Sequence, residues 1–173
     1  DSTLGGVSRF DGKQFTTFTV EDGLSSNDVP ALIQDARGRW WFGTDAGLCL
    51  FDGEQFTTFT IEDGLPSDQV TALALDREGD LWIGTIGGVA RYDGEYFELL
   101  AYGGELSNVN VEDLLVDETG ALWMAADPGI WRYDGSDFSF YTTRDGLVSI
   151  NFNALLEDRD GDIWAGADEG VNR

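Results

Sequence analysis

The chain has 173 residues, of which 42% are hydrophobic and 13% aromatic. This length and composition allow a buried core and exclude an intrinsically disordered chain. Asp and Glu number 33 against 10 Lys and Arg, and the resulting net charge of -23 repels nucleic-acid phosphates and anionic lipid. We therefore expect neither nucleic acid nor a membrane among the partners.

Histidine is absent from the sequence. Its absence removes the commonest general base, every Ser–His or Cys–His nucleophile pair and every histidine-ligated metal site. We therefore expect a chain that is not an enzyme and has no catalytic residue, no metal site and no cofactor. No run of apolar residues approaches the length of a membrane-spanning helix.

The first predicted elements lie in residues 6–19, where two short runs rich in Phe and Thr flank Asp11-Gly12. These residue types suit a strand, and an Asp-Gly pair between two strands is a strong hairpin signal. The polar stretch 21–28 has no strand character and is predicted to be a loop. An apolar strand at 29–33 follows and ends in a turn from Asp35 to Gly38, where the aspartate can accept backbone hydrogen bonds.

The next strand, residues 40–44, contains Trp41, and from there the same order of elements returns every 41 residues. We name the four strands of a repeat a (as in 29–33), b (40–44), and c and d (the hairpin). A repeat of this length with four short antiparallel strands predicts an all-β propeller with four repeats per chain. The recurring structural positions are Trp41, Trp82, Trp123 and Trp164 in strand b and Asp35, Asp76, Asp117 and Asp158 at the a–b turn.

The repeat divides the single predicted domain, residues 1–173, into three blades and two half-blades. The blades are 29–60, 70–101 and 111–142; the half-blades are 6–19, with strands c and d, and 152–167, with strands a and b. The half-blades are complementary, and unpaired strand edges promote aggregation. We expect a homodimer in which two chains close one eight-bladed ring. A four-bladed monomer and a piece of a longer array are the alternatives.

In a propeller, the d–a and b–c connections lie on one face, which we call the loop face. Carboxylates and amides there could bind sugar hydroxyls, a cationic ligand or an oxygen-preferring ion. The alternative is that they are ordinary solvated loop residues. The candidate ligand-binding residues are Asp45, Asn110, Asp127, Asn151, Asp168 and Glu169, with Asp28, Asp68 and Tyr102 nearby.

Other suggestive residues have a structural interpretation. The sequence from Asp158 to Asp162 imitates a calcium-binding loop, but only its first aspartate recurs in every repeat, so we predict a hairpin turn. The four repeating tryptophans are expected in the core, as wedges between blades. An arginine recurs at one strand-c position, as Arg9, Arg91 and Arg132, and is expected to form an ion pair. The only cysteine, Cys49, is expected to be a packed thiol.

The repeat resembles the two-component regulator propeller repeat. The resemblance rests on D-x-x-G-x-[LI]-W-x-G-T, on G-[LV]-x-R-[FY]-D-G, and on F-x-x-[FY]-T-x-x-D-G-L-x-S, and covers almost the whole chain. It implies a ligand-sensing propeller from the extracytoplasmic region of a hybrid two-component receptor, with a carbohydrate or other small ligand. A purely structural or engineered repeat protein, and a propeller lyase or hydrolase using carboxylates, are the alternatives.

Overall fold

The computed structural model describes residues 5–100 and 109–173. It contains three complete four-stranded antiparallel sheets, each with its strands in chain order. Blade 1 consists of β3 (Ala31–Gln34), β4 (Trp40–Thr44), β5 (Gly47–Phe51) and β6 (Phe56–Phe59). Blade 2 consists of β7 (Val70–Leu75), β8 (Leu81–Thr85), β9 (Gly88–Tyr92) and β10 (Phe97–Leu100). Blade 3 consists of β11 (Val111–Val116), β12 (Leu122–Ala126), β13 (Gly129–Tyr133) and β14 (Phe138–Tyr141).

Two smaller sheets flank these blades. The N-terminal hairpin pairs β1 (Val7–Phe10) with β2 (Phe15–Phe18). The C-terminal sheet pairs β15 (Phe152–Glu157) with β16 (Ile163–Ala167), and β16 with β17 (Gly170–Asn172). The predicted all-β propeller with four-stranded blades is confirmed.

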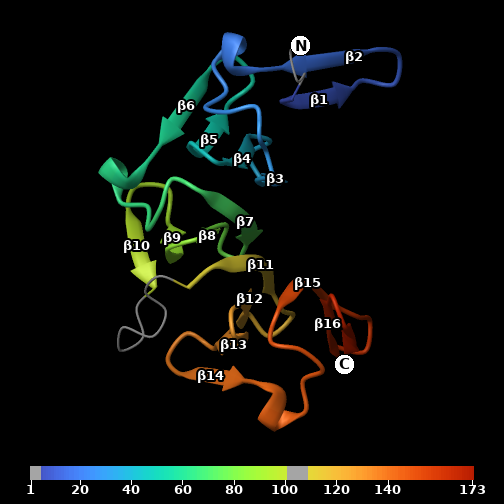
Figure 1. Cartoon of the computed structure of the whole chain (residues 1–173). Helices are drawn as coiled ribbons and strands as arrows, with labels where there is room; N and C mark the ends of the chain where they lie inside the picture. Colours follow the sequence, from blue (N-terminus) through green and yellow to red (C-terminus); the bar gives the residue numbers. More distant parts are fainter. Residues whose placement is uncertain (1–4, 101–108) are drawn as a thin grey trace.

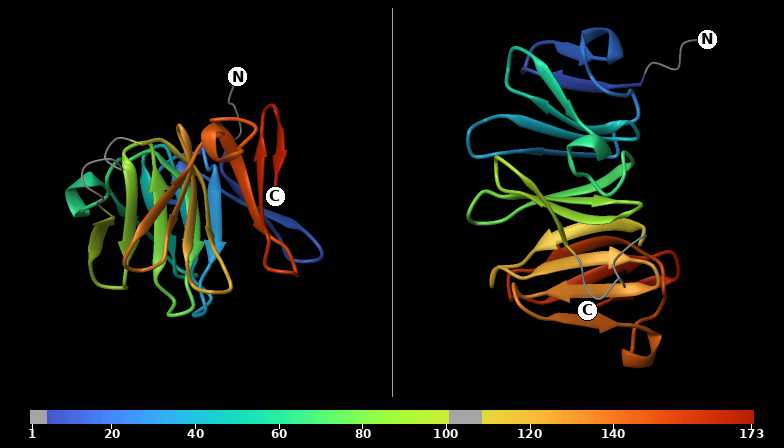
Figure 2. Two further views of the ribbon diagram at one scale, coloured as in Figure 1. Left: turned by 90° about the horizontal axis from the view of Figure 1, so that it is seen from below. Right: turned by 90° about the vertical axis from the view of Figure 1, so that its left-hand side faces the viewer.

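The sheets form an open arc (Figure 1). Strands β7, β11 and β15 lie along its inner side, whereas β6, β10 and β14 lie along its outer side. The successive sheets stack face to face in chain order (Figure 2). The N-terminal hairpin and the C-terminal sheet lie at the two ends of the arc and remain separate sheets. The alternative in which these ends pair within one chain to make a four-bladed ring is therefore not the arrangement of the described residues.

The core lies between neighbouring blades, where strand b of one blade faces strand c of the next. Trp41 is only 2% exposed and belongs to a buried cluster with Leu48, Leu81 and Ile83. Its ring lies 6.1 Å from that of Phe59 in its own blade and 5.6 Å from that of Tyr92 in blade 2. Cys49 is buried with a free thiol, as predicted.

The predicted Asp-x-x-Gly turns are present, and each aspartate also binds the repeating tryptophan. In the first repeat, Asp35 accepts backbone hydrogen bonds from Arg37 (2.9 Å) and Arg39 (3.0 Å) and a side-chain bond from Nε1 of Trp41 (3.2 Å). The indole bond recurs at 3.2, 2.8 and 2.7 Å in the pairs Trp82–Asp76, Trp123–Asp117 and Trp164–Asp158. The sequence located both residues but did not reveal that they bind each other.

The loop predicted at 21–28 begins with a short 3-10 turn, Val20–Asp22, that the sequence reading missed. Thr19 accepts a hydrogen bond from the Glu21 backbone, and Asp22 accepts one from the Thr19 backbone, which makes a capping box. Equivalent turns span Ile61–Asp63 and Thr143–Asp145. A single helical turn is too short to give a hydrophobic period, so only the Thr-x-x-Asp pattern could have revealed it.

Trp164 departs from the expected core position. It is 36% exposed, because no further blade covers its outer side among the described residues. Within residues 5–100 and 109–173, no helix is both long and apolar enough to cross a membrane.

Candidate functional site

A depression on the loop face lies where blade 3 meets the C-terminal sheet. Asp127 reaches it from the turn between β12 and β13, and Asp168 from the turn between β16 and β17. Asn151 reaches it from the connection that precedes β15. Three predicted ligand-binding residues, separated by up to 41 positions in the chain, thus line one site. The complete lining is Glu112, Asp127, Asn151, Phe152, Asn153 and Asp168.

Hydrogen bonds within the lining orient some of these groups. The side-chain amide of Asn153 donates to Oδ1 of Asp168 at 3.3 Å. The side-chain amide of Asn110 donates to Oε1 of Glu112, and its own Oδ1 is buried without a hydrogen-bond partner. Asn110 therefore does not line the depression itself but binds Glu112, which does. The buried Phe152 adds an apolar component to an otherwise polar lining.

The remaining predicted residues are not brought together. Asp45 lies in the turn between β4 and β5, at the position in blade 1 that Asp127 and Asp168 occupy further along. Glu169 follows Asp168 but does not line the depression. Tyr102 lies outside the described residues.

Asp113 is the residue that the sequence reading missed. The equivalent inner-strand positions carry Ala31, Ala72 and Ala154, so a comparison of the repeats could have singled it out. Burial raises the pKa of the Asp113 carboxyl above its ordinary value, although backbone N–H groups donate to it. The donors are Leu155 at 2.7 Å, across the blade boundary, and Leu114 at 2.9 Å. Asp113 therefore ties blade 3 to the C-terminal sheet beside the depression.

The chemistry of the depression suits a polar ligand. Its carboxylates accept hydrogen bonds, and its amides both donate and accept them. Among the described residues, no group of three or more Asp, Glu or Cys side chains is arranged to hold a metal ion. The arrangement can therefore recognise hydroxyl, amide or ammonium groups through hydrogen bonds.

Comparison with known proteins finds a family that matches three segments of the chain. The family described as "Two component regulator propeller" matches residues 23–46, 64–87 and 146–169. The matched segments leave out residues 105–128, where Trp123-Met-Ala-Ala126 replaces the usual Trp-x-Gly-Thr. No curated protein sequence matches the chain significantly.

Solved structures of similar shape include two bacterial extracellular domains. The extracellular domain of the hybrid two component system BT3049 from B. thetaiotaomicron has a TM-score of 0.83 and 25% identity over 97% of this chain. The extracellular domain of BT4673, a one component system from the same organism, has a TM-score of 0.82 and 22% identity over 97% of this chain. This chain spans 24% and 25% of their respective lengths.

A more distant likeness is to an enzyme. Virginiamycin B lyase from Staphylococcus aureus, in a catalytically inactive form with quinupristin, has a TM-score of 0.73. It is 14% identical, and the match covers 91% of this chain and 55% of the lyase. At this identity the likeness establishes the fold alone. Three segments of this chain, one in each of three repeats, match the two component regulator propeller family.

Proposed function

We propose that this chain is a non-catalytic β-propeller that binds a small polar ligand, such as a short glycan, on its loop face. The observation that carries the proposal is the convergence of Asp127, Asn151 and Asp168 in one depression between two sheets. Side chains from separate blades can fix the orientation of a ligand, whereas scattered loop residues cannot.

The divergence of the third repeat supports this site. Residues 105–128 depart from the family pattern, and this repeat supplies Glu112 to the depression as well as the neighbouring Asp113. Neither carboxylate recurs at its position in the other repeats, whereas Asp127 recurs as Asp45 and Asp168. Carboxylates that the repeat does not require, beside the depression, favour a specific role over a purely structural one.

The ligand class follows from the charge. A depression with three carboxylates, in a chain of net charge -23, disfavours anions. A neutral molecule with many hydroxyl groups can donate to the carboxylates and exchange hydrogen bonds with Asn151 and Asn153. Resemblance to extracellular domains of two component and one component systems supports a sensing role and an extracytoplasmic location.

A lyase activity has less support. The lyase of similar fold is inactive in a histidine-to-alanine form, and this chain contains no histidine. A shared propeller fold does not transfer an activity, because function depends on the residues of the site.

Thermal unfolding in the presence of a panel of neutral oligosaccharides and divalent ions tests the proposal. We expect at least one oligosaccharide to raise the Tm. A ligand at a hundred times its Kd adds about 2.7 kcal/mol, or several degrees in a domain of this size. The variant Asp127→Ala/Asn151→Ala/Asp168→Ala should lose the gain.

Asp45→Ala is the matched control, since Asp45 occupies the equivalent turn of blade 1 outside the depression. It should keep the full rise in Tm. No rise with any oligosaccharide, or a rise that persists in the triple variant, would refute binding at this depression.

A further inference from the structure

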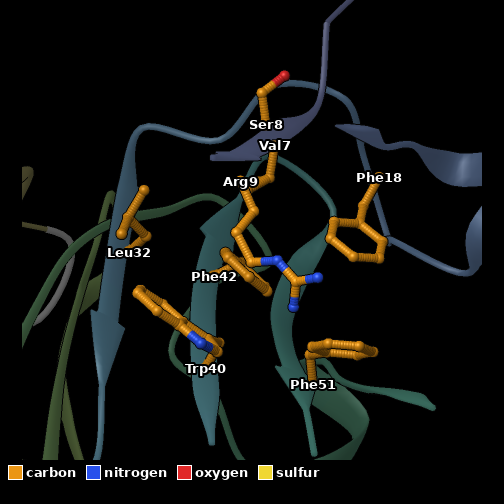
Figure 3. Close-up of a pocket in the computed structure, with 8 residues that line it drawn as sticks. All are labelled: Val7, Ser8, Arg9, Phe18, Leu32, Trp40, Phe42 and Phe51. Atoms are coloured by element: carbon orange, nitrogen blue, oxygen red, sulfur yellow. The ribbon is translucent and has the colours of Figure 1, made fainter. Parts of the chain in front are cut away.

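Exposed apolar side chains occupy both ends of the arc. On the C-terminal sheet, Leu156 is 63% and Trp164 36% exposed. At the opposite end, a cavity opens between the N-terminal hairpin and blade 1, and Arg9 extends into it toward the rings of Phe18 and Phe51 (Figure 3). The lining of this cavity is Val7, Ser8, Arg9, Phe18, Leu32, Trp40, Phe42 and Phe51.

The boundary between blades 1 and 2 shows what such a cavity accepts. There, Trp41 stacks on Phe59 and meets Tyr92 edge-on, and the latter two rings lie 5.8 Å apart. The repeat-equivalents of that pair are Phe18 and Phe51, whose rings lie 5.3 Å apart.

Among residues 5–100 and 109–173, no tryptophan ring packs against Phe18 or Phe51, so this pair lacks the counterpart of Trp41. Trp164 occupies the same repeat position at the other end of the arc, with its ring partly exposed. Leu156 likewise corresponds to Ile33, which packs against the cluster that contains Trp41.

We propose that a second copy of this chain docks here, with its Trp164 and Leu156 in the cavity beside Phe18 and Phe51. The N-terminal hairpin then completes the C-terminal sheet of the second copy. The same contact in reverse closes a symmetric eight-bladed ring of two chains. The interface continues the blade–blade contact that already repeats within the chain.

The C-terminal strand β17 shows how the docked strand would pair. In the C-terminal sheet, Ala165 pairs with Asn172 of β17, and Arg173 lies over Trp164 and forms an ion pair with Asp162. Residues Gly6–Arg9 stand at the same repeat position as 170–173, with the same Gly-Val-x-Arg pattern. β17 therefore occupies the place of β1 from the second copy, and docking requires that β17 be displaced.

The exchange preserves charge complementarity. In blade 2, Arg91 forms an ion pair with Asp80 and lies over Trp82. Arg9 has the equivalent place and would meet Asp162 and Trp164 of the second copy once Arg173 has left. The net charge of -23 on each copy opposes their association, so added salt should strengthen the dimer by screening this repulsion.

Sedimentation equilibrium over a concentration series tests the proposal. The wild type should rise from 18.9 kDa toward twice that mass. Trp164→Ala should weaken the dimer by at least about tenfold in Kd, since a buried aromatic anchor contributes more than about 1.4 kcal/mol. Ile61→Ala is the matched control. Ile61 is an exposed apolar residue in the turn that connects blades 1 and 2, away from both ends of the arc, so the Kd of this variant should equal that of the wild type.

Two further variants separate docking from folding of the C-terminal sheet. Arg9→Glu, at the opposite end of the arc, should weaken the dimer while the far-UV circular dichroism stays unchanged. Asn172→Pro removes the side-chain bonds of Asn172 to Val148 and Gly146, which loosens β17 and should tighten the dimer. A monomer at every concentration, a dimer indifferent to Trp164→Ala and Arg9→Glu, or open polymers heavier than a dimer would overturn the proposal.

Discussion

Trp41 and Trp164 occupy the same position of the repeat in two different surroundings. Both donate a hydrogen bond to the turn aspartate of their own repeat. An arginine lies over each ring, Arg39 at 5.4 Å and Arg173 at 5.5 Å, although the two arginines come from different positions of the repeat. Trp41 is nevertheless 2% exposed and Trp164 36%. The local geometry is set within each repeat, whereas burial depends on the neighbouring blade. Substitutions at equivalent positions can therefore separate the stability that comes from local hydrogen bonds from the stability that comes from burial by a neighbouring blade.

The largest difference is expected between Trp41→Ala and Trp164→Ala. Removing a fully buried tryptophan costs about 3–5 kcal/mol, because the surrounding residues cannot fill the cavity. Trp164→Ala should cost a small fraction of that in the monomer, since part of its surface already faces solvent. Chemical denaturation at a protein concentration that keeps the chain monomeric measures both. Equal losses would show that Trp164 is packed in the monomer.

Replacing a turn aspartate should likewise destabilise the chain more where the turn is buried than where it is exposed. Asp117 is almost fully buried and accepts bonds from Thr119 (2.8 Å from N, 2.6 Å from Oγ1), Ala121 (2.9 Å) and Trp123 (2.8 Å). Asp117→Ala leaves buried donors unsatisfied and should cost about 2–3 kcal/mol in the free energy of unfolding. Asp158→Ala, in the exposed equivalent turn, should cost clearly less. A larger loss at Asp158 would mean that the turns do not depend on their neighbours.

Arg91→Leu is expected to have a modest effect. The predicted ion pair is present, to Asp80, but the arginine side chain is 38% exposed and its attraction is screened by solvent. Leu50 already occupies the equivalent place in blade 1, so leucine fits the strand. We expect a change of about 1 kcal/mol or less in urea unfolding. A collapse of the fold would show that the ion pair is essential to the blade.

The smallest effect is the pH dependence that Asp113 introduces. Because burial raises its pKa in the folded chain, folding is favoured by protonated Asp113, and this contribution is lost as the pH rises through the folded pKa. Asp113→Ala should therefore gain stability relative to the wild type as the pH rises from 3.8 toward neutrality. The difference in Tm between variant and wild type, measured from pH 3 to 8, checks this. A difference that does not change with pH would rule out titration of Asp113.

Most of the fold follows from the repeat, because each 41-residue unit carries its own turns and strand pattern. The Trp–Asp hydrogen bonds could not be read from the sequence, since nothing in the spacing of Asp35 and Trp41 shows that their side chains meet. For the candidate site, the repeat pattern showed which polar residues belong to the loop face. The curvature of the arc decides which of them converge, so the grouping of Asp127 with Asn151 required the structure.

The central claim is that one chain completes the sheet of another. A disulfide between two copies tests this claim most directly. If β1 of one copy replaces β17 of the other, Ser8 takes the place of Asn172 opposite Ala165. Ser8→Cys/Ala165→Cys can be made in a Cys49→Ala background, since Ala90 is already the natural residue at the equivalent position. Under oxidising conditions we predict a covalent dimer on a non-reducing gel. A monomer with two free thiols, or with a disulfide inside one chain, would contradict it.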